Sequence, residues 1–142
     1  MQVTTPQTPN DWEEYFDLRW RILRAPWNQP KGSERVEDDN TSFHAMIRND
    51  EKVIACGRIH PVDDQTAQIR FMAVDYAYQG MGIGSLVLRY LEEYAIKKKI
   101  KKIILQAREE AISFYERNGY SMVKKTDLLF GTIQHYLMEK NI

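Results

Sequence analysis

Three glycines at alternate positions, Gly80, Gly82 and Gly84, separate two segments of different periodicity and constrain the fold more than any other feature. Residues 67–74 alternate apolar and polar side chains, which predicts a strand. Residues 82–99 repeat apolar side chains at helical spacing, which predicts a long amphipathic helix. Glycine tolerates positive φ and lets a ligand approach the main chain, while free N–H groups at a helix start attract anions. The sequence therefore predicts a strand–turn–helix unit that binds an anion, with a diphosphate as the favoured ligand.

Neither of the two common nucleotide-binding loops matches this turn. A Rossmann fingerprint has G-x-G-x-x-G after the first strand, whereas these glycines alternate and lie late in the chain. A Walker A loop ends in Gly-Lys-Ser/Thr, whereas Gly84 is followed by Ser85 and Leu86. A purely structural turn without a ligand is the alternative interpretation.

The remaining patterns predict one mixed α+β domain that occupies residues 1–142. Thr8, Pro9 and Asp11 combine a capping hydroxyl, a first-turn proline and an acid at the positive helix end, which predicts a helix start. The later strand–helix–strand order implies at least one right-handed crossover. Strands are expected at 3–5, 43–48, 53–60, 67–74, 102–106, 120–125 and 135–139, and helices at 8–23, 82–99 and 109–118, with residues 33–41 forming a loop or short helix.

Composition limits the possible partners. Lysine plus arginine number 20 and aspartate plus glutamate number 20, so the chain lacks the basic excess typical of nucleic-acid binders. It has no stretch of about 20 apolar residues for a membrane helix and no signal-peptide pattern at its start. A single cysteine, Cys56, fits a reducing compartment, and the three histidines do not have metal-ligand spacing. We therefore expect a cytoplasmic protein that uses no metal and binds neither nucleic acid nor membrane.

Two sequence motifs together resemble the GNAT superfamily of N-acetyltransferases. Gln79-x-x-Gly82-x-Gly84 is similar to the Gln/Arg-x-x-Gly-x-Gly/Ala pyrophosphate loop of that family. The segment 108–120, Arg-Glu-Glu-Ala-x-x-Phe-Tyr-Glu-x-x-Gly-Tyr, resembles its second signature, Asn-x-x-Ala-x-x-Phe-Tyr-x-x-x-Gly-Phe. The resemblance implies an acyl-CoA N-acyltransferase fold with a central, mostly antiparallel sheet flanked by about four helices. Residues 57–59 and 129–138 also look similar to the ElaA-like branch.

The resemblance implies a binding site for acetyl-CoA. Main-chain N–H groups around Met72 and Val74 would meet the acetyl and pantetheine arm, and an exposed N–H there polarises a thioester carbonyl. Arg108 stands where the family often has asparagine, so it contacts the cofactor or substrate, or else forms a surface ion pair. The cofactor-binding residues implied are Met72, Ala73, Val74, Gln79, Gly80, Met81, Gly82, Ile83, Gly84, Ser85, Arg108 and Phe114.

Two residues are candidates for catalysis. Tyr115 matches the family tyrosine near the cofactor sulfur, where a phenol can protonate the leaving thiolate; its alternative role is that of a core aromatic. His135 is either the general base or a structural histidine. Glu34, Glu37, Asp38 and Asp39 either line an amine-binding entrance or form a solvated acidic loop.

The resemblance implies an enzyme that transfers acetyl directly from acetyl-CoA to a primary amine of a small molecule or peptide. No nucleophilic serine or cysteine is then needed. The alternative is a non-catalytic acyl-CoA-binding or sensor module. A homodimer is plausible for the family.

Overall fold

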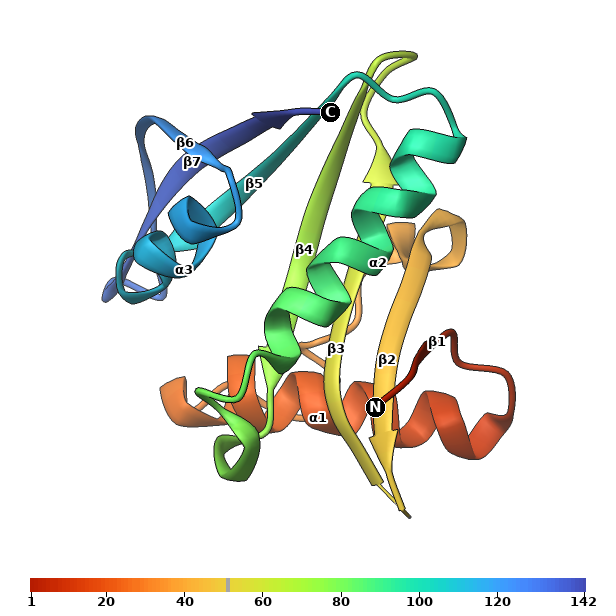
Figure 1. Cartoon of the computed structure of the whole chain (residues 1–142). Helices are drawn as coiled ribbons and strands as arrows, with labels where there is room; N and C mark the ends of the chain where they lie inside the picture. The colour runs from red at the N-terminus through yellow and green to blue at the C-terminus, as the bar shows by residue number, and fades with distance from the viewer. Residues whose placement is uncertain (51) are drawn as a thin grey trace.

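Seven strands form one mixed sheet in the computed structural model, which describes residues 1–50 and 52–142 (Figure 1). Their order across the sheet is β1-β2-β3-β4-β5-β7-β6, and only β4 and β5 pair in parallel among the described residues. The predicted mostly antiparallel mixed sheet is therefore confirmed. The strands are β1 (Val3–Thr4), β2 (Phe43–Asn49), β3 (Lys52–Pro61), β4 (Thr66–Val74), β5 (Lys102–Arg108), β6 (Ser121–Leu129) and β7 (Ile133–Asn141).

The described residues form three α-helices: α1 (Pro9–Leu23), α2 (Ile83–Lys97) and α3 (Ile112–Arg117). The described residues also form four short 3-10 helices, one of which, η2 (Glu37–Thr41), lies in the acidic segment. The α-helices alone are therefore one fewer than the expected number of about four. At the start of α1, the Thr8 hydroxyl accepts from Asp11 N–H at 3.0 Å and the Asp11 carboxylate accepts from Thr8 N–H at 3.2 Å. This reciprocal capping explains why the helix begins where the sequence predicts. None of the helices in the described residues is both long enough and apolar enough to cross a bilayer.

Two hydrophobic cores lie on opposite faces of the sheet. The larger one packs α2 and α3 against the sheet, with Val87, Leu91 and Tyr115 among its members. The smaller one packs α1 on the other face through Tyr15, Leu18 and neighbouring apolar side chains. Figure 1 shows α1 and α2 on either side of the strands β2 to β4. The sheet therefore has an α1 face and an α2 face, and these names are used below for the side on which each residue lies.

The sheet divides where β4 and β5 meet. Their parallel pairing joins residues 66–69 to residues 102–105, although both strands continue beyond that point. Figure 1 shows the two strands diverging from their paired ends. The carboxyl-terminal part of β4 is consequently an interior strand edge with no strand partner on the side of β5.

Candidate active site

A cavity of about 420 Å³ occupies the space between the diverging strands. Side chains of β4, β5, β6, β7, α3 and the end of α1 line it, including four predicted site residues: Met72, Arg108, Tyr115 and His135. Arg24, Arg70 and Asp127 also line the cavity, and none of the three belongs to a motif that predicts a site. Arg70 alternates with the apolar side chains of its strand, so the period-two pattern predicts the face of the sheet on which it lies. The pattern does not predict that the sheet opens beside it.

A β-bulge deforms β4 at the cavity. The pairing of β3 with β4 shifts between Cys56 and Arg58, and Phe71 has a φ of 58°. A left-handed conformation in a bulky residue is a strained arrangement that costs about 1–3 kcal/mol and is found most often at functional sites. The bulge bends the strand and changes the direction of the peptide groups that follow it.

After the bulge, main-chain donors face the gap. Asp75 N–H donates to Ile54 C=O of β3 at 2.8 Å. Because N–H directions alternate along a strand, the N–H groups of Val74 and Met72 point away from β3, toward the cavity side. Ala73 differs from its two neighbours, since it is buried in the core beneath α1. Alternation therefore turns the N–H groups of Met72 and Val74 toward the cavity side, while Ala73 packs on the other face of the strand. The role of these two N–H groups in binding stays a prediction.

Arginine side chains surround the strained Phe71. The guanidinium carbon of Arg19 lies 4.1 Å from the Phe71 ring centre, that of Arg70 4.5 Å, that of Arg58 5.4 Å and that of Arg24 5.5 Å. The Phe71 carbonyl also accepts a hydrogen bond from the Cys56 thiol at 3.5 Å. These contacts hold the ring and backbone of Phe71 in place and offset the strain of the bulge.

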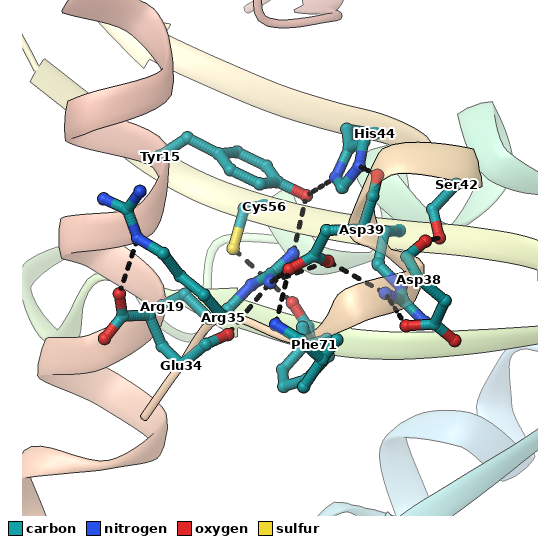
Figure 2. A network of polar contacts seen from close by, with 12 residues as sticks. Tyr15, Arg19, Glu34, Arg35, Asp38, Asp39, Ser42, His44, Cys56 and Phe71 are labelled. Atoms are coloured by element: carbon teal, nitrogen blue, oxygen red, sulfur yellow. Dashed lines mark hydrogen bonds and ion pairs between the residues drawn. The ribbon is translucent and has the colours of Figure 1, made fainter. Parts of the chain in front are cut away.

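Behind Phe71, two buried arginines are neutralised by η2 (Figure 2). Arg19 Nη1 lies 3.0 Å from Asp39 Oδ1, and Arg58 Nη1 lies 2.8 Å from both Asp39 Oδ1 and Asp38 Oδ1. The side chain of Asp39 is 9% exposed, so the acidic segment is not simply a solvated loop. Asp38 and Asp39 therefore neutralise buried arginines. This role differs from both predicted ones, an amine-binding entrance and a solvated acidic loop.

A chain of hydrogen bonds extends this network to His44. Burial lowers the pKa of His44, so its ring is neutral at neutral pH. Its Nε2–H then donates to Asp39 C=O at 2.7 Å, and its Nδ1 accepts from the Tyr15 hydroxyl at 2.7 Å. Arg19 Nη2 donates in turn to the Tyr15 oxygen at 3.2 Å. The Gly57 carbonyl oxygen, 3.2 Å from the Tyr15 hydroxyl, is a second acceptor for that group. These contacts connect η2 to α1, β2 and β3.

Tyr115 reaches the cavity from the α2 face. It is 8% exposed, and its hydroxyl has no hydrogen-bond partner among the described residues. Burial raises the pKa of Tyr115 to about 12, and the charge of Arg108 acts in the opposite direction. The phenol is therefore protonated at neutral pH and has a proton to donate.

His135 reaches the cavity from the opposite face. It is the register partner of Arg108, so the two side chains lie on the same face of the sheet. His135 Nδ1 lies 3.0 Å from Ile133 C=O, and a carbonyl can only accept, so Nδ1 carries the proton in the neutral ring. Nε2 is then left as the basic nitrogen. Arg108 lies 5.2 Å from the Trp27 ring centre and 3.8 Å from the Glu110 carboxylate.

The glycine turn lies beside the cavity but does not line it. Gly80 and Gly82 have φ values of 79° and 78°, and apart from the glycine and its two chain neighbours no described residue has an atom within 4 Å of the position that a Cβ would occupy at either one. At Gly84 a Cβ would lie 3.2 Å from the Phe114 ring, so this glycine lets Phe114 pack on α2. Phe114 precedes Tyr115, and through it the turn adjoins the cavity.

The other residues of the turn have distinct environments. Gln79 donates from its side chain to Val74 C=O at 3.0 Å, which closes the turn onto the end of β4. Met81 is 63% exposed, Ile83 is buried in the core, and Ser85 is partly buried in the first turn of α2. No side chain caps the N-terminus of α2, and its first turn contains no acid. No group of three or more His, Cys, Asp or Glu residues in the described part of the chain is arranged to hold a metal ion.

This mixed α+β fold with a split central sheet is that of solved N-acetyltransferase structures. The family model of the acetyltransferase (GNAT) family matches residues 12–120, and the chain belongs to that family. It is accordingly an acetyltransferase of the acyltransferase class. The predicted family and fold are confirmed.

Individual relatives agree with this assignment. A Bacillus subtilis (strain 168) protein, described as the uncharacterized N-acetyltransferase YjcF, is 24% identical over 141 residues, which cover 99% of this chain and 100% of the relative. An aminoglycoside 6'-N-acetyltransferase complexed with coenzyme A aligns with a TM-score of 0.83 at 15% identity and covers 99% of this chain and 97% of its own. Escherichia coli ElaA aligns with a TM-score of 0.77 at 19% identity, covering 98% and 97%. At these identities the structural likeness shows a shared fold, and the ElaA-like branch stays a prediction.

Proposed function

We propose that this protein transfers an acetyl group from acetyl-CoA directly to a primary amine of a small molecule or peptide. One observation carries the proposal: the cavity between β4 and β5 has a protonated phenol on one face and a basic imidazole nitrogen on the other. Acetyl-CoA, when bound, supplies an acetyl group activated as a thioester. The coenzyme A in the aminoglycoside acetyltransferase complex supports this co-substrate.

The glycine turn fits the pyrophosphate of acetyl-CoA. The uncapped N-terminus of α2 offers main-chain donors and the positive end of the helix dipole. Open space at Gly80 and Gly82 lets an anion approach the backbone. The N–H groups of residues 82–85 would therefore hold the phosphates.

The cavity residues have chemical roles that match acetyl transfer. Of the N–H groups of Met72 and Val74, one would donate to the carbonyl oxygen as negative charge develops on it, and the other would meet the pantetheine arm. His135 Nε2 would accept the proton from the amine, and Tyr115 would protonate the departing thiolate.

The lack of a serine, threonine or cysteine nucleophile among the described lining residues favours direct transfer. Cys56 is buried elsewhere, and burial raises the pKa of its thiol to about 11. Both observations support direct attack of the amine on the thioester.

Calorimetric titration with acetyl-CoA tests the co-substrate assignment. We expect wild type to bind, and we expect Gly82→Leu to lose at least about 10-fold in affinity, because its side chain strains a positive φ and blocks the approach to the backbone. Gly32→Leu is the matched control, since Gly32 has a φ of 103° and lies away from the cavity. Absence of binding to wild type, or equal affinity in wild type and Gly82→Leu, would refute the assignment.

A further inference from the structure

Three guanidinium groups line the cavity together with His135. Arg70 and Arg24 both lie within cation–π distance of the Phe71 ring on the α1 face. Arg108 shares its face with His135 through their register pairing. The only carboxylate among the described lining residues is that of Asp127, on β6. The cavity therefore carries an excess of positive charge.

That charge is poorly compensated by the protein. Arg70 forms no hydrogen bond or ion pair with any other described residue, although it is partly buried. Arg24 donates to the Ser33 and Leu23 carbonyls at 3.2 Å and 3.0 Å, which satisfies donors but supplies no negative charge. Arg108 has its nearest carboxylate at 3.8 Å, on a Glu110 side chain that is 69% exposed. Burial and repulsion from neighbouring arginines lower the pKa values of Arg24 and Arg70, although the charge of Glu34 opposes the shift at Arg24 and the charges of Asp38 and Asp39 oppose it at Arg70.

The same protein neutralises its other buried arginines. Arg19 and Arg58 each meet a carboxylate of η2 at 3.0 Å or less. Partly buried like charges oppose one another, and a fold gains nothing from gathering them unless an anion joins them. The unpaired guanidinium groups point to a ligand that brings its own negative charge.

We infer that the acceptor is a primary amine that also bears a carboxylate or phosphate group, as an amino acid does, and that Arg70 and Arg24 bind this anion. The inference rests on the proposed function. His135 lies on the same face, so one small acceptor can place its amine at Nε2 and its anion at the arginines. Polyamines and other acceptors with only positive charges are disfavoured by this surface.

The phosphates of coenzyme A are a second possible source of the negative charge that the arginines bind. Measuring acetyl-CoA affinity distinguishes binding of these phosphates from binding of the acceptor's anion. If the arginines serve the acceptor, Arg70→Gln binds acetyl-CoA within about twofold of wild type. Loss of acetyl-CoA affinity in Arg70→Gln, with acceptor preference unchanged, would assign the arginines to the co-substrate and overturn the inference.

The direct test compares matched acceptors that differ in charge. Amino acids are assayed beside their amides, and phosphoethanolamine beside ethanolamine, by following thiol release from acetyl-CoA. We expect the acid of at least one pair to exceed its neutral partner by about 10-fold or more in kcat/KM, the scale of one charge-assisted hydrogen bond. Arg70→Gln should remove most of that difference, while Arg89→Gln, at an exposed position on α2, should keep it. Equal or better use of the neutral amines would overturn the inference but leave the proposed function intact.

A binding measurement covers the case in which no amine is acetylated. If no amine causes thiol release, that result contradicts the proposed function but does not test the inference about the arginines. N-acetyl amino acids and their amides are then titrated into the protein loaded with coenzyme A. Tighter binding of the acids, dependent on Arg70, supports the inference. Equal binding of acids and amides, or no binding of either, overturns it.

Discussion

At the scale of single residues, Phe71 links strain, charge and geometry. Its positive φ forms the bulge, its ring contacts four guanidinium groups, and the following N–H groups face the cavity. No sequence pattern indicated this, since phenylalanine at an alternating position is typical of an ordinary strand. Tyr115 was predictable because it follows a motif, and the structure adds its free hydroxyl and raised pKa.

Replacement of Tyr115 by phenylalanine separates an enzyme from a binding module. The variant loses a proton donor but keeps the ring that packs in the core, so we expect kcat to fall by about 100-fold or more. Affinity for acetyl-CoA should change by no more than about twofold, as measured by calorimetry. Undiminished turnover would show that the phenol is only a core aromatic.

At the scale of elements, the boundaries were largely predictable and the contacts between elements were not. Local signals such as the Thr8 cap, the alternation in β4 and the glycine turn lie within a few residues of what they determine. The pairing of Arg19 with Asp39 joins residues 20 apart in sequence, one in a predicted helix and the other in a segment predicted as a loop or short helix. Its geometry depends on the assembled sheet, which local periodicity does not encode.

Gly57 provides a test of how β3 supports the bulge in β4. A Cβ at Gly57 would lie 2.5 Å from Met72 Sδ and 3.1 Å from side-chain carbons of Leu91 and Val87. We expect Gly57→Ala to lower the free energy of unfolding by about 1–3 kcal/mol, the usual cost of overpacking. Shortening Met72 in the double variant Gly57→Ala/Met72→Ala should recover part of that loss.

Denaturant titration of the two single variants and the double variant measures this coupling. Because both side chains compete for one space, their effects should not add. Strict additivity would mean that Met72 relaxes away from residue 57 and that the bulge does not require glycine there.

At the scale of the whole molecule, η2 connects α1, β2 and β3 through buried polar groups. Burial lowers the pKa of His44 and of His60 from the ordinary value of 6.5. A histidine whose folded-state pKa is depressed binds protons more readily when unfolded. Its contribution to stability is therefore complete above pH 6.5 and is lost as the pH falls toward the folded-state pKa.

We expect the free energy of unfolding to decrease between about pH 7.5 and pH 5.5, by about 1.4 kcal/mol for each unit of pKa depression. His44→Gln should reduce this slope, and His44→Gln/His60→Gln should reduce it further. Urea titrations across the pH range measure the effect. A slope that is unchanged in the double variant would place the titrating groups elsewhere.

The short ladder between β4 and β5 has a thermodynamic consequence. Only four residue pairs join the strands, and the peptide groups beyond them form an edge inside the sheet. An extended ligand with amide groups could hydrogen-bond to that edge as an additional strand does. Occupancy would then be linked to folding: a ligand that binds only the native sheet raises the melting temperature as its concentration rises above its Kd. Because the ligand completes the open sheet, the shift in melting temperature reports how much of the protein is occupied.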